Sequence, residues 1–153
     1  MSSARQIWIT GAACAISMWL AGCQGEGPEI KGTVKLDGKA LDGVRVSFVP
    51  LDPKLGGAVA ETDASGAFKI MPQADGVTLK AGKYGVTFSR MVDAQGNVPP
   101  ARDRLILEKA GKLREWIPAK YSAQTALRAD SPPAEIVDIQ DGPADLPFDL
   151  KSQ

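Results

Sequence analysis

The residues best suited to covalent chemistry in this sequence are two cysteines, because the chain contains no histidine. Cys14 lies inside an apolar segment, and Cys23 lies where that segment turns polar, in "LAGCQGEGPEIKG". Nucleophiles activated by an adjacent histidine are therefore excluded, and so is a typical histidine-rich zinc site. The chemistry of Cys23 depends on the segment that precedes it.

That segment has the parts of a secretory signal peptide. Arg5 is the only charge before Glu26. Residues 7–20 form a mostly apolar run of about fourteen residues, which is short of the roughly 20 that a membrane span needs. The run ends in the small residues Ala21 and Gly22.

The four residues Leu20, Ala21, Gly22 and Cys23 resemble the lipobox of bacterial lipoproteins. In that family the cysteine thiol is alkylated with a diacylglyceryl group, the signal is cut before the cysteine, and the new amino group is usually acylated. The resemblance implies a signal peptide over residues 1–22, lipidation at Cys23 and a lipid-anchored tether over residues 23–29. The residues alone also allow an uncleaved anchor, or a buried N-terminal helix with an incidental cysteine.

The lipobox resemblance places the protein in the cell envelope, with the membrane contacted through the N-terminal lipid. Each buried methylene contributes about 0.8 kcal/mol, so two or three acyl chains would hold the protein on a membrane permanently. In Gram-negative lipoproteins an Asp after the cysteine commonly causes retention in the inner membrane. Gln24 occupies that position here, which favours the outer membrane.

Cleavage of the leader would remove Cys14, Trp8 and Trp19, and lipid would occupy Cys23. We therefore expect a domain that has no free thiol, no disulfide, no metal site and no cofactor. The chain has 18 basic and 18 acidic residues, and only Arg5 lies in the leader. The charge thus stays close to balanced, which excludes general attraction to nucleic acid.

The remaining residues alternate between apolar and polar with a period of two, which predicts strands with one buried face. The pattern is clear at residues 30–36, 44–50, 67–70, 83–89 and 145–151, and weaker at 57–62, 126–129 and 134–139. Turn signals such as Asp37-Gly38 and Asp63-Ala-Ser-Gly66 separate these segments. The sequence predicts an all-β fold over residues 30–151, an antiparallel β-sandwich of about seven strands. Pro147 should lie at a sheet edge or at a position that is not hydrogen-bonded in the ladder.

Three motifs in this region resemble carboxypeptidase-regulatory-like domains, which have a transthyretin-like or prealbumin-like fold. The matching positions are Gly32, Val34, Asp37, Gly38, Gly43, Val44 and Val46; Thr62, Asp63, Gly66 and Phe68; and Leu79, Gly82, Tyr84 and Val86. "IPAKYS" (117–122) and a closing "FDLK" (148–151) are similar to small envelope lipoproteins that carry this domain. The motifs have structural explanations as well: the glycines allow turns, Asp63 closes its turn, and Phe68 and Tyr84 fill the core.

Residues 91–117 interrupt the strand pattern and predict a loop or short-helix insertion. Ile106, Ala110, Leu113 and Ile117 have helical spacing, although Gly111 weakens a helix by about 1 kcal/mol relative to Ala. The segment either covers the end of the sandwich or binds a partner, because loops on a rigid scaffold often carry function. Trp116 and Tyr121 are the candidate binding residues.

These observations favour a non-catalytic, lipid-anchored envelope module that contacts a protein or an envelope polysaccharide. The transthyretin-like purine-pathway hydrolases use catalytic histidines, so that branch of the fold is excluded. The alternative function is a carbohydrate-binding module, for which Trp116 and Tyr121 would have to form an aromatic platform.

The lipoprotein interpretation makes a direct prediction about Cys23. Cys23→Ser should block lipidation and cleavage, because serine cannot form the thioether to the diacylglyceryl group. Mass spectrometry should then find the uncleaved precursor without lipid. A variant that fractionates with the membrane and has the wild-type mass would contradict the interpretation.

Overall fold

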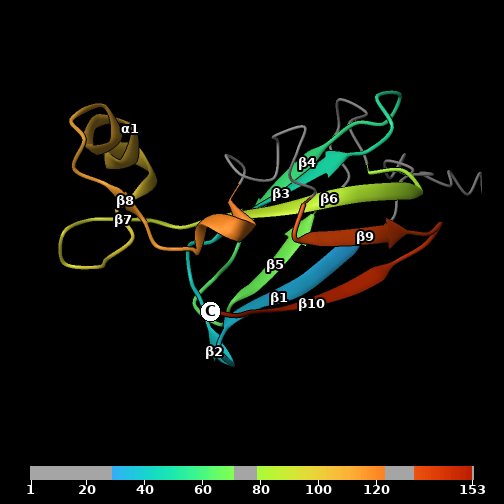
Figure 1. Ribbon diagram of the computed structural model, residues 1–153, viewed down its shortest axis with the longest axis horizontal. Coiled ribbons are helices and arrows are strands. Elements are labelled where there is room, and N and C mark those ends of the chain that lie inside the picture. Colours follow the sequence, from blue (N-terminus) through green and yellow to red (C-terminus); the bar gives the residue numbers. More distant parts are fainter. Residues whose placement is uncertain (1–28, 71–78, 123–132, 153) are drawn as a thin grey trace, which may run out of the picture.

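The computed structural model describes residues 29–70, 79–122 and 133–152 (Figure 1). The strands in these ranges are β1 (Ile30–Leu36), β2 (Lys39–Ala40), β3 (Arg45–Pro50), β4 (Ala58–Glu61), β5 (Ala67–Ile70), β6 (Gly82–Ser89), β7 (Met91–Val92), β8 (Arg114–Glu115), β9 (Glu135–Ile139) and β10 (Ala144–Leu150). The helical elements are α1 (Ala101–Lys109) and the 3-10 turn η1 (Ala119–Tyr121). The leader, the lipobox and the predicted strand at 126–129 lie outside the described residues.

Two four-stranded sheets contain most of the strands. In the first sheet β1 pairs with β10 on one side, and with β2 and β5 on the other. The second sheet has the order β4-β3-β6-β9 and is antiparallel throughout. Seven of these strands have four or more residues, and each falls where the period-two pattern predicts a strand.

The inner faces of the two sheets form one hydrophobic core. Its fully buried members include Ile30, Val34 and Leu150 from the first sheet, and Val46, Phe48, Tyr84, Val86 and Phe88 from the second. The rings of Phe88 and Phe148 meet across the sheets at 5.0 Å between centroids. The all-β sandwich predicted from the sequence is confirmed. The core members lie between residues 30 and 150, so residues 24–153 contain the whole core that the structure describes.

One pair of strands departs from the antiparallel pattern. β1 and β10 are parallel, with Ile30 opposite Ala144 and Leu36 opposite Leu150. The short turn after β9 carries the chain from the second sheet to the first, so β10 runs beside β1 in the same direction (Figure 1). β10 is an edge strand and contains Pro147, as expected of a residue that cannot donate to a ladder.

A glycine in β1 makes room for an aromatic ring in the core. Gly32 lies opposite Phe68 in the β1–β5 register. A Cβ atom on Gly32 would lie 2.1 Å from the carbonyl oxygen of Leu146 and 2.8 Å from the Phe68 ring. Gly32 therefore continues the inward-facing row of β1 without a side chain, and Phe68 fills the space.

The turn after β4 is closed by an aspartate, as its sequence predicts. Asp63 Oδ1 accepts hydrogen bonds from the Ser65 amide at 2.8 Å and from the Ala67 amide at 3.1 Å. Gly66 has φ +76°, and a Cβ there would lie 2.7 Å from the carbonyl oxygen of Val34. The hydrogen bonds from Ser65 and Ala67 hold the pKa of the Asp63 carboxyl below its ordinary range. The turn uses this carboxylate as a structural acceptor.

We expect Phe68→Ala to lower the free energy of unfolding by roughly 3–5 kcal/mol, because it leaves a cavity that Gly32 cannot fill. Phe68 is 4% exposed. The matched control is Lys69→Ala, whose side chain is half exposed and pairs with Glu29 at the surface. Denaturant unfolding of residues 24–153 should give a much smaller loss for the control. Similar losses at the two positions would contradict the packing described here.

Candidate functional site

The insertion, residues 91–117, leaves the sandwich after β6 and returns before η1 (Figure 1). It contains the two-stranded sheet of β7 and β8, with α1 between them in sequence. Met91 pairs with Glu115, and Val92 pairs with Arg114, so the start and the end of the insertion are held together.

The helix of the insertion is shorter than the sequence pattern predicts. α1 ends at Lys109, and Gly111 follows with φ +64°. The Lys112 amide donates to the Leu107 carbonyl and the Gly111 amide donates to the Glu108 carbonyl, each at 2.9 Å. This is a Schellman motif, in which a left-handed glycine ends a helix. The prediction that one helical face extends from Ile106 to Ile117 is therefore wrong.

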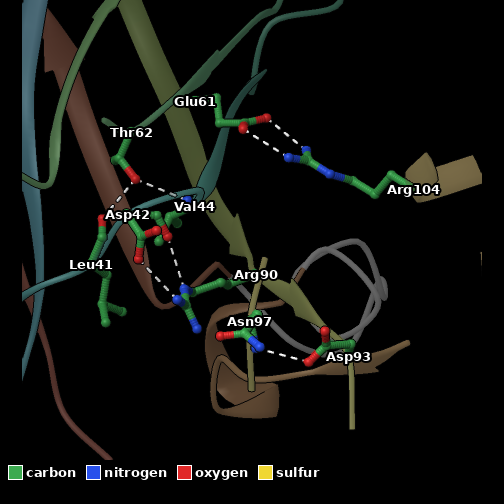
Figure 2. Close-up of polar contacts among 9 residues, drawn as sticks. All are labelled: Leu41, Asp42, Val44, Glu61, Thr62, Arg90, Asp93, Asn97 and Arg104. Atoms are coloured by element: carbon green, nitrogen blue, oxygen red, sulfur yellow. Dashed lines mark hydrogen bonds and ion pairs between the residues drawn. The ribbon is translucent and has the colours of Figure 1, made fainter. Parts of the chain in front are cut away.

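An ion pair joins α1 to the edge of the second sheet. Arg104 Nη1 and Nη2 donate to the two carboxylate oxygens of Glu61 on β4, at 2.8 and 3.0 Å (Figure 2). Such bidentate pairs fix geometry as well as charge. The hydrogen bonds from Arg104 lower the pKa of Glu61 below its ordinary value of 4.5, although partial burial opposes the shift.

A buried arginine fixes the point at which the insertion begins. Arg90 directly follows β6 and is 9% exposed. Its Nε donates to the Asp42 carbonyl at 2.8 Å, and Nη2 donates to Asp42 Oδ1 at 2.9 Å (Figure 2). A buried guanidinium needs such partners, because an unpaired buried charge is strongly unfavourable.

The loop that carries Asp42 is fixed from its other side by Thr62. The Thr62 hydroxyl donates to the Leu41 carbonyl at 2.7 Å and accepts from the Val44 amide at 2.9 Å (Figure 2). Thr62 is buried, so these bonds exchange little with water. The 41–44 loop is thus a rigid support for Arg90.

Glu115 fixes the end of the insertion. Its Oε1 accepts from the backbone amides of Arg90, Trp116 and Ile117 at 2.7, 3.0 and 3.0 Å. Its Oε2 accepts from the Ser89 hydroxyl at 2.7 Å. One carboxylate therefore joins the end of β6 to the segment that returns to the sandwich.

These contacts shape an open groove between the end of the sandwich and the insertion. Its volume is about 680 Å³. The lining residues are Gly43, Arg45, Ser89, Met91, Arg104, Glu108, Glu115, Ile117, Ala119 and Ser122. Charges of both signs and two large apolar side chains are present, which is the lining of a site that binds by mixed polar and apolar contacts.

The two candidate binding residues from the sequence lie in different surroundings. Trp116 is 45% exposed, and the Arg114 guanidinium lies 5.4 Å from its ring centroid. Tyr121 is buried, packs edge-on against Phe88 at 6.3 Å and accepts a hydrogen bond from the Lys151 amide. The ring of Tyr121 is part of the core, so these two residues do not supply a shared exposed platform. Leu20, Ala21, Gly22 and Cys23 lie outside the described residues.

Sequence reasoning missed the residues that build the groove. Arg104 pairs with Glu61, 43 residues away, and Glu115 accepts from Ser89 and Arg90, 26 and 25 residues away, as well as from its neighbours Trp116 and Ile117. Arg90 carried one usable signal, since a charge directly after a buried strand must find a partner. The described parts of the chain contain no group of three or more His, Cys, Asp or Glu side chains that could hold a metal ion. Within them, no helix has the length and hydropathy to cross a bilayer.

Comparisons with known proteins add little to this geometry. No protein-family model and no curated protein matches the chain. Among solved structures, the chain is similar to a crystal structure of a candidate carbohydrate binding protein from Pseudomonas aeruginosa. The two are 14% identical, the match covers 84% of this chain and 90% of the other, and the TM-score is 0.40. This similarity is too weak to carry a function, which we therefore argue from the groove.

The ion pair between Arg104 and Glu61 should make the attachment of α1 sensitive to acid. A carboxyl with a lowered pKa stabilises the fold above its unfolded pKa, and this contribution is lost as the pH falls through the lower folded value. The protection factors of the amides of residues 101–109, which are exchange rates corrected for their intrinsic pH dependence, should therefore be constant between about pH 6 and 8 and fall below pH 4.5, the ordinary value for Glu61.

Glu61→Gln should raise the exchange of α1 already at neutral pH and remove its acid dependence. Asp145→Asn, at an exposed position on β10, is the matched control and should leave α1 unchanged. The prediction is contradicted if the amide protection of α1 in the Glu61→Gln variant equals that of the wild type at every pH.

Proposed function

We propose that this protein is a non-enzymatic module of the cell envelope, anchored through lipid on Cys23, that binds a partner protein in the groove beside the insertion. The observation that carries the proposal is a groove with both walls fixed by specific contacts. Arg90 and Glu115 fix the insertion at its two ends, and Arg104 fixes α1 to β4. A preorganised site loses less conformational entropy when it binds.

The lining of the groove favours a polypeptide over a sugar. Arg45 supplies guanidinium donors, and Glu108 supplies a carboxylate acceptor. Met91 and Ile117 supply apolar surface between them. None of the lining residues is aromatic, so the groove has no ring against which a sugar could stack. A protein segment with charged and apolar side chains would satisfy both kinds of contact.

The carboxylates of the groove support binding rather than acid–base catalysis. Glu115 uses both oxygens to accept hydrogen bonds from the chain, so it is engaged in holding the insertion. Glu108 lies on the exposed helix α1. With no histidine in the sequence, the groove lacks the usual partner for a nucleophile.

The groove lies at the opposite end of the sandwich from Ile30, the first strand residue after the expected tether. β1 begins at Ile30, which pairs with Ala144 at the start of β10. The preceding strand, β9, ends at Ile139, which pairs with Gly82 at the start of β6. Ile30 and Gly82 therefore lie at the same end of the sandwich. From Gly82, β6 runs eight residues to Ser89 at the groove. At about 3.3 Å per residue these ends are roughly 25 Å apart. Lipid on Cys23 would therefore leave the groove open.

Site-specific photo-crosslinking in the native membrane tests this proposal. A photo-reactive amino acid placed at Glu108 in the lipoprotein should give adducts with a discrete protein, identified by mass spectrometry. The matched control is the same replacement at Lys31, which is exposed on β1 away from the groove. Adducts from Glu108 should disappear when Arg45→Glu is added.

Equal adducts from both positions, or none from Glu108, would overturn the proposal. Adducts with glycan instead of protein would overturn the choice of partner and favour the carbohydrate-binding alternative. Anchoring is tested separately by Cys23→Ser, so a failure of one part is distinguishable from a failure of the other.

A further inference from the structure

The helix α1 directs two of its three large apolar residues toward solvent, while the third, Leu107, is partly buried. Leu105 and Ile106 are 59% and 69% exposed, and the helix has no buried residue. Arg104 and Glu108, one turn apart, instead face the sandwich and the groove. A helix on the surface of a soluble domain normally has the opposite arrangement, with the apolar face against the core. The exposed pair therefore calls for an explanation outside the fold.

The insertion also has exposed positive charges close in sequence to these apolar residues. Lys109, Lys112 and Arg114 are all exposed. The acidic residues of the same segment have other partners, beginning with Asp93, whose Oδ1 accepts from the Gln95 and Asn97 amides in its own turn. Asp103 lies 3.6 Å from its neighbour Arg102, Glu108 lines the groove, and Glu115 accepts hydrogen bonds from the chain.

The exposed tryptophan belongs to the same insertion. Trp116 is 45% exposed, and its ring lies beside the Arg114 guanidinium. Tryptophan is favoured at the boundary between lipid and water, where its ring can be half buried. Leucine, isoleucine and tryptophan together with lysine and arginine are the composition of segments that lie in a membrane interface.

We propose that the exposed residues Leu105, Ile106, Lys109, Lys112, Arg114 and Trp116 of the insertion together form one surface that binds an anionic lipid bilayer. The charge of this surface is complementary to anionic headgroups, and its apolar residues can enter the boundary of the acyl chains. The proposal rests on the envelope location proposed above. It adds a second membrane contact, roughly 25 Å from the end that carries the tether.

Two membrane contacts at opposite ends of the domain would fix its orientation on the membrane, which one flexible tether cannot do. Residues 23–29 are rich in glycine, so a lipid on Cys23 alone leaves the domain free to rotate. Contact through the insertion would lay the long axis of the sandwich along the membrane. The groove uses Arg104 and Glu108 from the other side of α1, so lipid contact and partner binding do not compete for side chains.

The protein carries its own reporter for this proposal. Once the leader is removed, Trp116 is the only tryptophan in the chain. Unlipidated residues 24–153 should show a blue shift of tryptophan emission with vesicles of phosphatidylcholine and phosphatidylglycerol. Vesicles of phosphatidylcholine alone should give little shift. High salt should reverse the shift, because it screens exposed charges.

Matched variants separate the two parts of the surface. Leu105→Ser with Ile106→Ser should abolish vesicle binding without loss of stability, since neither side chain is buried. Ile136→Ser, at a position 53% exposed on β9, is the apolar control and should bind like the wild type. Lys109→Ala should weaken partition about fivefold, the effect of one charge near an anionic surface. Lys39→Ala, on β2, should leave it unchanged.

The proposal is overturned if neither vesicle shifts the emission, if both shift it equally, or if the double serine variant binds like the wild type. In the first case the surface would instead be a candidate for a protein partner. The assay contains no groove partner and no lipid anchor, so its failure leaves the crosslinking result untouched, and the reverse also holds.

Discussion

A continuous series of aromatic contacts holds the two sheets and the end of the insertion in one body. The four phenylalanines of the chain all belong to it. Phe48 contacts Phe68 across the sheets, Phe68 contacts Phe148 within the first sheet, and Phe148 returns across to Phe88. Phe88 then contacts Tyr121 in η1. Aromatic pairs contribute beyond the area that they bury, so this sequence, poor in aromatics, concentrates them where the sheets must join.

At the end of this series the packing changes from apolar to charged. β6 supplies Phe88 to the core, and Arg90, which directly follows the strand, makes a polar contact with Asp42 that is buried on the arginine side. Glu115 extends that contact to the returning chain. A core of rings sets the position of η1, while charged hydrogen bonds set the angle at which the insertion leaves. Removing Asp42 would cost more than the pair contributes, because the Arg90 guanidinium is buried and would be left unsatisfied, whereas the Asp42 carboxylate is more than half exposed.

The sequence predicted the sandwich better than the site, and the reason is the range of the interactions. Strand faces and the Asp63 turn depend on neighbours one to four residues away, which a pattern can reveal. The groove depends on Arg90 with Asp42 and on Arg104 with Glu61, which are 48 and 43 residues apart. The prediction of Tyr121 as an exposed binding residue is wrong for a similar reason, because its burial depends on Phe88 in a distant strand.

The wrong end of α1 shows how a local signal can be overweighted. The apolar spacing from Ile106 to Ile117 predicts one helix, in which Gly111 would lower helix stability by only about 1 kcal/mol relative to Ala. Gly111 instead adopts φ +64° and ends the helix, which allows Arg114 and Glu115 to form the short strand β8.

The inverted orientation of α1 follows from how that helix is stabilised. A helix of nine residues is marginal in water and normally depends on burying its apolar face. Here the Schellman motif at Gly111 and the ion pair of Arg104 with Glu61 supply the stabilisation instead. Leu105 and Ile106 are consequently not required to hold the helix in place. A fold that attaches a helix by its charged side keeps its apolar side available, and it does so beside exposed cations in a chain whose N-terminus resembles a lipid anchor.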